Sequence, residues 1–509
     1  MPVTQAGAIN TTALIVPDLY VQIVPPSVSL LNGVPTNVLG VVGTATWGPV
    51  NSPTIVGSMA QFAQLFGAIQ ARKYDMGTAV AAAVLQGANN MRCVRVTDGT
   101  DVAASIVVLT NCITFTSKYS GSLGNTAQVT LSAGSAASTT KAVVTMPGLV
   151  AEAFDNIAGS GNAFWVNLAS AINNGVSGLR GPSQLIVATA GAGVTAPTLT
   201  SYTLSGGTDG ATTITATVLV GQDTVPRKGM YALRNTGASV AMLADADDST
   251  QWSLQVAYGL SEGTYMVGVG PAGDTISNAA TVKGTAGIDS YAFKLLFGDW
   301  VYFKDTVNGQ VRLISPQGFI AGLLSNLSPE QSTLNKPLYG VVGTQKSFQN
   351  QVYSAAELQA LGVAGIDVIT NPVPGGQYFG ARYGHNSSSN AVTNGDNYTR
   401  MTNYLAYTLN AGMGKFVGQL QTPTVRRNAA ATISAFLDAL VQQGMIGNAA
   451  GSLPYSVQID GSNNPANRVA LGYMQADVKV QYLAVIEKFL INLEGGTSVA
   501  INRQSTQLA

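Results

Sequence analysis

The start of the chain carries two apolar runs separated by two amphipathic segments. Residues 36–43 are almost continuously apolar, which is typical of a strand buried on both faces. Ser58 and Asp75 are good N-cap residues, and apolar side chains recur at helical spacing after each of them. Residues 91–96 again have the composition of a strand. The pattern therefore predicts a unit of mixed α and β structure.

The pattern changes at about residue 105. From there to residue 210, Thr, Ser, Ala, Val and Gly dominate, and Gly and Ser turns separate short strand-like runs. These runs include residues 106–109, 128–131, 141–145 and 185–189. One helical stretch, at residues 164–172, interrupts them. This segment is predicted to be a small β-sandwich, and the Gly-rich run 206–210 that closes it is expected to be a flexible hinge or turn.

Strand and helix patterns alternate over residues 213–392. We expect Thr250 to cap one helix, and Ser354 with Glu357 forms a capping box at the start of another. The strand-like runs are residues 240–244, 265–269, 294–303, 338–342 and 367–370. Such alternation predicts a parallel sheet with right-handed crossovers.

Two amphipathic helices open the last part of the chain. One follows Asp396, and the other starts just after Arg426 and Arg427 and ends near Gly444. After the helices, strands are expected at residues 455–459, 469–480 and 485–493.

Each end of the chain also has a short alternating run set apart by turn residues. Residues 20–24 are closed by two prolines, and residues 499–502 follow the Gly495–Gly496 pair. A strand bounded in this way suits the edge of a sheet, or a sheet on another molecule. We therefore expect a detachable strand at both ends.

Composition and charge narrow the function. Only 10% of the 509 residues are charged, and the 25 Lys and Arg residues equal the 25 Asp and Glu residues in number. Direct binding of nucleic acid is not expected, because the chain has no basic excess to meet a phosphate backbone. No apolar run approaches the roughly 20 residues that span a bilayer, and no signal-peptide pattern is present. A large chain without net charge favours ordered association, so we predict an assembly subunit kept in a cytoplasm.

Residues that could carry out chemistry are few. His385 is the only histidine and lies in a polar loop sequence, where a solvated side chain is a better interpretation than the base of a hydrolase. Asp245, Asp247 and Asp248 follow a strand, but the positions after them are wrong for an EF-hand. We interpret these three carboxylates as a solvated helix N-terminus.

Two further patterns are also interpreted without chemistry. Residues 340–347 approach a P-loop, but Gln345 replaces the second glycine, which the backbone needs to wrap a phosphate. Cys93 and Cys112 fit neither a zinc site nor a redox pair and are interpreted as buried hydrophobic residues. The sequence therefore assigns no catalytic residue, no metal ligand and no cofactor.

A series of short motifs runs through nearly the whole chain. They are residues 17–22, 33–36, 41–45, 48–51, 58–67, 79–96, 118–125, 206–210, 365–369, 380–383 and 455–465. In this order they resemble the tail sheath proteins of contractile-tailed bacteriophages. The sequence departs from that family at residues 271–288, which are rich in Gly and Ala, and at residues 302–317, which lack a Pro-Pro pair.

The resemblance implies a multidomain α/β and α+β architecture. In such proteins both chain ends build a core domain, a β-sandwich is inserted, and an α/β domain is similar to the subtilisin fold without its active site. We therefore predict an N-terminal arm, a first part of the core domain, the β-sandwich, the α/β domain, a second part of the core domain and a C-terminal arm. Their ranges are 1–35, 36–104, 105–212, 213–392, 393–494 and 495–509.

The resemblance also implies a function. Sheath subunits form hexameric rings that stack helically around a tail tube, and the stack contracts to drive the tube through the host envelope for genome delivery. The implied partners are other copies of the chain, the tube protein, and baseplate and tail terminator proteins, in a virion tail assembled in the host cytoplasm. No membrane insertion is implied. Two alternatives stay open: a structural virion or tube-forming protein that does not contract, and a hydrolase on the α/β domain.

A lattice that slides without coming apart needs links that hold while the subunits move, and strands exchanged between neighbours can supply them. We therefore predict donated strands at both chain ends and an acceptor sheet that would otherwise expose an edge. Arg426 and Arg427 are predicted to contact the tube. The predicted donors are Tyr20, Val21, Gln22, Ile23, Val24, Val499, Ala500, Ile501 and Asn502, and the predicted acceptor sheet contains Val478, Val480, Phe489 and Ile491.

Overall fold

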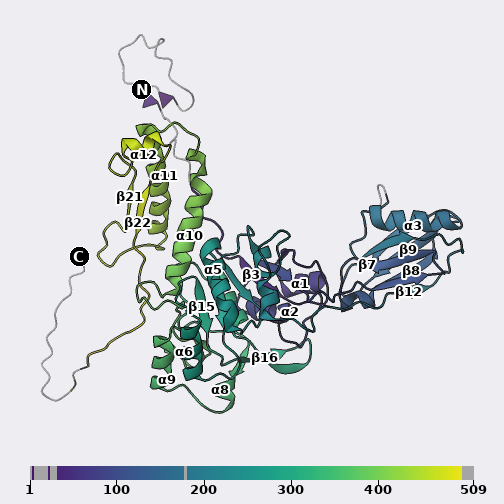
Figure 1. Cartoon of the computed structure of the whole chain (residues 1–509), viewed down its shortest axis with the longest axis horizontal. Coiled ribbons are helices and arrows are strands. Elements are labelled where there is room, and N and C mark those ends of the chain that lie inside the picture. The colour runs from purple at the N-terminus through teal and green to yellow at the C-terminus, as the bar shows by residue number, and fades with distance from the viewer. Residues whose placement is uncertain (1–2, 5–20, 23–30, 177–179, 494, 496–509) are drawn as a thin grey trace, which may run out of the picture.

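The computed structural model describes residues 3–4, 21–22, 31–176, 180–493 and 495. These residues form three parts along the long axis of the molecule (Figure 1). A central body of α/β structure carries a β-rich outer lobe on one side, joined by a narrow neck. On the other side it carries a C-terminal lobe built around two long helices.

A sheet of six strands forms the centre of the body. Its order is β15 (Phe293–Leu296), β14 (Tyr265–Val269), β13 (Val240–Leu243), β3 (Leu39–Gly43), β5 (Met91–Arg95) and β4 (Thr54–Val56). Neighbouring strands are parallel except for β4, which is antiparallel to β5 at the edge. β3 is buried along its whole length, as its continuous apolar run predicts.

The pairing of β3 with β13 changes the predicted division of the chain. The sequence assigns residues 36–104 to a core domain shared with residues 393–494. In the structure, β3 and β5 lie in the same sheet as strands from residues 213–392, so these two segments form one body. Local patterns could not show this, because a parallel strand finds its neighbour through tertiary contacts and not through adjacent sequence.

Helices cover both faces of the central sheet. On one face lie α1 (Met59–Phe66), α2 (Met76–Leu85) and α7 (Gln317–Asn326); on the other lie α4 (Ala216–Val220), α5 (Trp252–Glu262), α6 (Ile276–Thr285) and α9 (Ala355–Val363). Each face has its own hydrophobic core of helix and strand side chains. Ser58 and Asp75 cap α1 and α2, and Ser354 and Glu357 form the capping box of α9, so these predictions are confirmed.

Smaller elements complete the body. β17 (Gln310–Ile314), β16 (Val301–Asp305) and β18 (Val341–Thr344) form one sheet, β19 (Ile369–Thr370) pairs with β20 (Gly380–Ala381), and α8 (Gln345–Phe348) follows β18. The single strand expected at residues 294–303 is wrong, because the chain turns after β15 and β16 joins a different sheet. Thr250 does not cap α5: its N–H donates to Asp248 in a 3-10 turn that precedes the helix.

The outer lobe contains two antiparallel sheets and one helix around a common core. One sheet has the order β10 (Glu152–Ile157), β9 (Thr140–Thr145), β8 (Gln128–Ala133) and β12 (Ser201–Thr203); the other has β11 (Ile186–Ala190), β7 (Ile113–Ser117) and β6 (Ser105–Val108). The predicted helix is α3 (Asn162–Asn174), and its Phe164 and Trp165 are buried in that core. The sequence pattern indicated β6, β8, β9 and β11 but not the other three strands.

A buried arginine closes the neck between the outer lobe and the body. Arg95 donates to the carbonyl oxygens of Gly48 at 2.8 Å, Ser120 at 2.7 Å and Asp209 at 3.1 Å. Its side chain is fully buried, and burial lowers its pKa to about 10. The Asp209 carboxylate in turn pairs with Arg72 at 2.7 Å. These contacts hold residues 206–210, where a flexible hinge or turn was expected, in place.

Replacing Arg95 with methionine is expected to destabilise the neck. Three carbonyl groups would lose a charged donor inside the protein, at a cost of about 3 kcal/mol in the free energy of unfolding. Urea unfolding would measure this loss, and limited proteolysis would show new cleavage between the outer lobe and the body. Arg92→Met on the same strand is the control and should cost less than about 1 kcal/mol, because that side chain is only half-buried. Equal losses for the two variants would contradict the role of Arg95.

The C-terminal lobe packs a small sheet against two helices. Its elements are α10 (Asp396–Met413), α11 (Pro423–Gln442), β21 (Tyr455–Gln458), α12 (Ala466–Ala470) and β22 (Asp477–Val480). Met401 and Leu405 of α10 meet Ile433, Phe436 and Leu437 of α11 in its core. The strand expected at residues 469–480 is correct only in its last part, because the chain first completes α12 and a turn. No helix in the described part of the chain is long and apolar enough to cross a membrane.

A buried ionic cluster joins this lobe to the body. Lys294 Nζ on β15 donates to Asp367 Oδ2 at 2.6 Å and to Asp396 Oδ1 at 3.0 Å, and all three side chains are fully buried. Asp396 begins α10 and also accepts hydrogen bonds from the hydroxyls of Tyr265 and Thr333. Burial alone would lower the pKa of Lys294, but the two carboxylates outweigh it and raise that pKa above its usual value. The start of α10 is therefore fixed to the central sheet.

Candidate assembly surfaces

The two-stranded sheet of β21 and β22 lies against α11. Tyr455 pairs with Val480 and Val457 with Val478, and these four side chains pack on the core of the C-terminal lobe. The Tyr455 hydroxyl donates to Asp438 Oδ1 on α11 at 2.5 Å. Burial, together with this contact, raises the pKa of Tyr455 to about 12. The sheet is therefore held firmly on the helix by one of its faces.

Each strand of this sheet pairs on one side only within the described part of the chain. An unpaired edge presents a row of N–H and C=O groups to which another extended segment can add. The predicted acceptor residues Val478 and Val480 lie in β22. The structure therefore places this half of the predicted acceptor in a sheet with open edges.

The other two predicted acceptor residues, Phe489 and Ile491, are not in a sheet. Residues 481–493 leave the lobe as an extended trace without strand pairing (Figure 1). From here on we call residues 481–493 the C-terminal arm, in place of the predicted arm at residues 495–509. Phe489 is 82% exposed and Ile491 is 70% exposed. The prediction of an acceptor strand at residues 485–493 is therefore wrong: its composition is that of a strand, but no described strand of this chain lies beside it.

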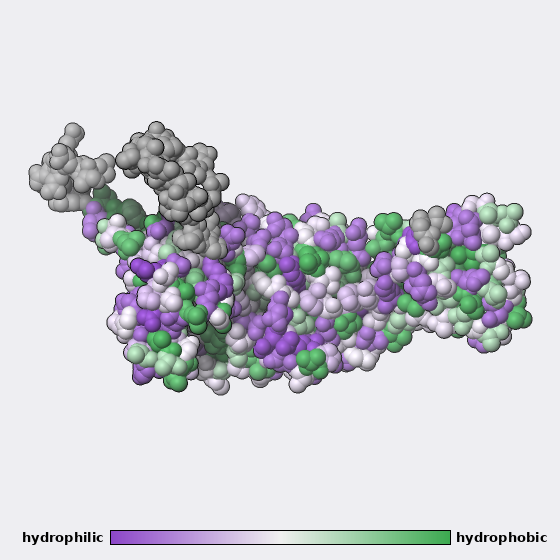
Figure 2. Space-filling view, turned by 90° about the horizontal axis from the view of Figure 1, so that it is seen from above, coloured by the Kyte–Doolittle hydropathy of each residue, from purple (hydrophilic) through white to green (hydrophobic). Residues whose placement is uncertain are grey.

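The C-terminal arm instead presents a run of apolar side chains to solvent. Figure 2 shows apolar residues at the end of the molecule opposite the outer lobe. The exposed apolar residues of the arm are Leu483, Ile486, Phe489, Leu490, Ile491 and Leu493. Such a run is unusual on a free surface, so the arm is a candidate for contact with another segment or molecule. The apolar content of residues 485–493 predicted a strand but did not indicate that these residues are exposed.

Of the predicted N-terminal donor strand, only Val21 and Gln22 belong to the described residues. β2 (Val21–Gln22) pairs in parallel with β1 (Val3–Thr4) of the same chain. The other predicted donors lie outside the described residues: Tyr20, Ile23, Val24, Val499, Ala500, Ile501 and Asn502.

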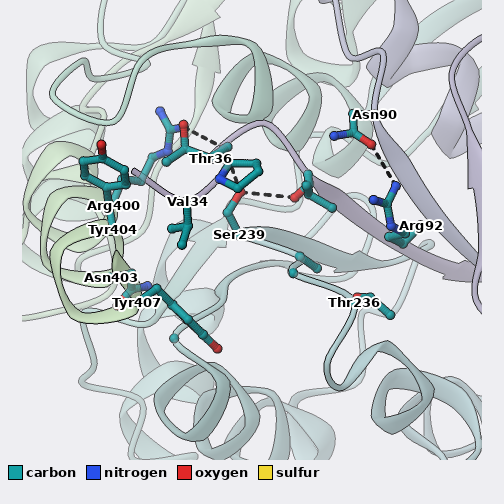
Figure 3. A pocket seen from close by; sticks show the side chains of 15 residues that line it. Val34, Thr36, Asn90, Arg92, Thr236, Ser239, Arg400, Asn403, Tyr404 and Tyr407 are labelled. Atoms are coloured by element: carbon teal, nitrogen blue, oxygen red, sulfur yellow. Dashed lines mark hydrogen bonds between the residues drawn. The ribbon is translucent and has the colours of Figure 1, made fainter. Parts of the chain in front are cut away.

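The connector to the N-terminal arm is fixed to the body at Val34 and Thr36. The Val34 N–H donates to Thr408 Oγ1 on α10 at 3.2 Å. The Thr36 carbonyl accepts hydrogen bonds from Ser239 Oγ at 2.7 Å and from Arg400 Nη2 at 3.3 Å. Val34, Thr36, Ser239 and Arg400 line a cavity of about 270 Å³ beneath α10 (Figure 3). The N-terminal arm therefore leaves the body at a defined point beside the helix that carries the C-terminal lobe.

Solved structures of sheath proteins match this architecture over most of the chain. The sheath tail protein of Desulfitobacterium hafniense has a TM-score of 0.58 at 13% identity, covering 86% of this chain and 93% of its own. The sheath tail protein of Listeria innocua has 0.60 at 11%, covering 89% and 96%. The contracted helical sheath of the anti-feeding prophage has 0.56 at 12%, covering 94% and 99%. This chain has the fold of contractile sheath proteins. No protein-family model and no curated protein matches it, so the likeness is one of fold.

In this sheath fold, Arg426 and Arg427 lie in the first turns of α11, which begins at the end of the C-terminal lobe away from the body (Figure 1). The expectation that they precede the helix is wrong, because Thr422 caps it and Pro423 occupies its first turn. With its amide oriented to satisfy both neighbours, Gln421 donates to the Tyr473 carbonyl and accepts from Arg426. The exposed apolar residues on the adjoining segments are Val417, Leu420, Leu471 and Tyr473. The tip of the lobe therefore combines two arginines with apolar surface.

The residues considered for chemistry serve structural contacts in the sheath fold. The loop of His385 is not solvated as expected: Asn386 and Ser387 are buried, and His385 Nε2 lies 2.7 Å from Glu487 Oε1. In the segment that approaches a P-loop, Lys346 Nζ pairs with Glu357 at 2.6 Å. Within the part of the chain that the structure describes, no group of three or more His, Cys, Asp or Glu side chains could hold a metal ion.

The three aspartates after β13 are divided among different contacts. Asp247 pairs with Lys73, and Asp248 begins the turn before α5. Asp245 is half-buried rather than solvated and accepts a hydrogen bond from the Tyr74 N–H at 3.1 Å. Burial raises the pKa of Asp245 to about 6, and nearby Asp75 adds to the effect. The interpretation of all three as a solvated helix N-terminus is therefore wrong for Asp245.

Asp245→Asn is expected to make the protein more stable than the wild type near neutral pH. The folded-state pKa of about 6 lies above the ordinary value of 3.8, so the unfolded chain loses this proton first as pH rises. The wild type therefore loses stability between about pH 4 and pH 6, by up to about 3 kcal/mol for a two-unit shift, and the variant avoids that loss. Urea unfolding at pH 4, 5, 6 and 7.5 would measure it. A difference between the two proteins that stays constant over this range would contradict the prediction.

Proposed function

We propose that this chain is the structural subunit of the contractile sheath of a bacteriophage tail. The likeness of fold to sheath proteins supports this function. The observation that carries it is a pair of complementary surfaces on one chain: a two-stranded sheet with open edges, and an exposed apolar arm that no described strand of the same chain covers. A chain with both surfaces can form a polymer by completing the sheet of one copy with the arm of another.

In this proposal the sheet of β21 and β22 is the acceptor, and both chain ends are donors. The N-terminal donor is centred on Val21 and Gln22, as predicted from the sequence. The C-terminal donor begins earlier than predicted, within the C-terminal arm, and includes Phe489 and Ile491. Donated backbone suits a lattice that moves, because main-chain hydrogen bonds persist when the side-chain contacts between two bodies change.

We further propose that the subunits form hexameric rings that stack helically around a tail tube, between a baseplate and a tail terminator. The solved neighbours include a baseplate and a contracted sheath of the anti-feeding prophage. Contraction would exchange one packing of rigid bodies for another that buries more surface, and it would drive the tube through the host envelope. Such a spring needs no nucleotide and no catalytic residue, and the α/β body then serves as a scaffold in the position of the subtilisin-like domain.

The tip of the C-terminal lobe is our candidate for the tube contact. Arg426 and Arg427 lie there beside exposed Leu420 and Tyr473. Arginine together with aromatic and aliphatic surface is typical of the centre of protein interfaces. A partner with acidic and apolar residues on its outer wall would fit this surface, and the tube protein is the partner that a sheath encloses.

Electron microscopy of the purified protein tests the proposed function. At high concentration the full-length chain should form hollow tubes, and a chain that lacks residues 1–24 should remain dispersed although its body is folded. Tubes formed equally well by the truncated chain would favour a structural protein that assembles without exchanged strands. A density map of the polymer in which every β21–β22 sheet is completed only by its own chain would refute the proposal.

A further inference from the structure

The single histidine of the chain is held rigidly on the body. The His385 carbonyl accepts a hydrogen bond from Lys294 Nζ at 2.9 Å, so its backbone belongs to the buried ionic cluster. On either side, the Gly384 N–H donates to Asp367 Oδ2 at 3.0 Å and the Ser387 N–H donates to the Phe293 carbonyl at 2.7 Å. The imidazole itself is only 16% exposed. His385 is therefore a fixed side chain at the surface of the body.

The C-terminal arm contacts this side chain before its last residues, 488–493. At its start, Asn397 Nδ2 donates to the Leu483 carbonyl at 3.2 Å, and the Tyr482 hydroxyl lies 3.2 Å from Thr402 Oγ1. The last polar contact is that of Glu487 Oε1 with His385 Nε2 at 2.7 Å. Residues 488–493 make no hydrogen bond to the rest of the described chain. The arm thus separates from its own subunit immediately after Glu487.

We infer that the contact between His385 and Glu487 is a latch, which holds the C-terminal arm on its own subunit until a neighbouring copy binds the arm. The segment that is exchanged between subunits then begins at Lys488. This inference rests on the proposed function. An arm with several exposed apolar side chains can pair with any open edge, which risks disordered aggregation. A latch that keeps the arm beside α10 limits how far its apolar end can reach before an acceptor sheet is in position.

The strength of the contact suits this role. A partly exposed hydrogen bond between two side chains shifts an equilibrium by only a few fold, and Glu487 is 38% exposed. A donated strand that forms several main-chain hydrogen bonds and buries apolar side chains outweighs such a contact. The latch would therefore hold the arm in the free subunit and yield in the polymer without any cofactor or covalent change.

Trypsin cleavage after Lys488 reports directly on the latch. The assay uses dilute, unassembled full-length protein and follows the release of residues 489–503 by mass spectrometry. His385→Ala and Glu487→Ala should each increase the initial cleavage rate about three- to tenfold over the wild type. The double variant should be no faster than the faster single variant, because both changes break the same contact.

Two controls keep this assay specific. Glu487 lies next to the cleaved bond, so the rate for Glu487→Ala is divided by the rate for a synthetic peptide of residues 481–493 with the same change. Asp223→Asn removes a remote surface carboxylate that pairs with Arg227 and Arg234, and it should leave the rate unchanged. Equal normalised rates for the wild type, His385→Ala and Glu487→Ala would overturn the latch.

The consequence for assembly is measured separately by light scattering and microscopy. His385→Ala should shorten the lag before polymerisation and increase the share of irregular aggregates at least twofold. Faster cleavage together with an unchanged lag and an unchanged share of aggregates would overturn the role of the latch in assembly. If the wild type forms no tubes at all, the proposed function fails, but the cleavage result still decides whether the latch exists, because that assay uses the unassembled chain.

Discussion

Lys294→Met is expected to destabilise the folded protein by about 3–5 kcal/mol, which is a large part of the stability of an ordinary domain. The change removes the only positive charge in direct contact with the buried carboxylates of Asp367 and Asp396 within the described residues. Methionine fills a similar volume, so the loss comes from two uncompensated carboxylates and not from a cavity. Urea or thermal unfolding would measure it.

The position of the cluster gives this variant a second expected effect. Asp396 begins α10, so weakening its contacts should loosen the C-terminal lobe from the body before the rest of the chain unfolds. Hydrogen exchange should therefore increase first in α10. Lys304→Met is the matched control, because Lys304 is exposed on β16, and its effect should stay within about 0.5 kcal/mol. Similar losses of stability for Lys294→Met and Lys304→Met would contradict the expected stabilising role of the buried cluster.

The second large effect is expected from charges placed on the C-terminal arm. The double variant Phe489→Asp and Ile491→Asp should abolish polymerisation, raising the concentration needed for tubes by at least a hundredfold. A donated strand with these changes would bring two carboxylates into an apolar interface, which costs several kcal/mol. Sedimentation and electron microscopy of the purified protein would measure the change.

The same substitutions should leave the stability of the folded subunit nearly unchanged. Both side chains are largely exposed, so the midpoint of thermal unfolding of the dilute protein should change by less than about 2 °C. Val150→Asp in the outer lobe is the control, because Val150 is 85% exposed and lies far along the chain from either arm. Loss of tubes in the control, or normal tubes from the double variant, would contradict the role of the arm.

Local sequence signals predicted the elements whose causes are themselves local. Ser58, Asp75 and Ser354 cap their helices because a side-chain oxygen meets an N–H only three residues away. The continuous apolar run of β3 required burial on both faces, and the structure buries it. These signals located α1, α2, α9 and β3 without indicating which strands pair.

The errors came from contacts between distant segments. Residues 485–493 have the composition of a strand, but a strand needs a partner edge, and no described strand of this chain supplies one. The polar sequence around His385 predicts a solvated loop. In the structure, Lys294 and Asp367, which are distant in sequence, form hydrogen bonds with the backbone of this loop. A polar sequence predicts exposure only where the fold supplies no buried polar or charged partner for it.

The candidate assembly surfaces divide in the same way. The sequence located β21, the end of β22 and an apolar segment near the C-terminus, and it recognised that a neutral chain poor in charge favours association. It assigned Phe489 and Ile491 to the accepting sheet, whereas the structure leaves them exposed on an arm. Whether a segment accepts a strand or is itself the donated strand depends on which sheet edges the rest of the fold has already paired.

The order of residues alone thus determined the type and place of most elements, because capping, helical spacing and continuous burial act within a few positions of the chain. Only the tertiary structure decided that β3 joins β13, that Lys294 and His385 serve one junction, and that the C-terminal arm is left uncovered. Strand pairing and buried charge compensation act between residues from tens to about two hundred positions apart in this chain. Their free energy depends on geometry that no local pattern contains.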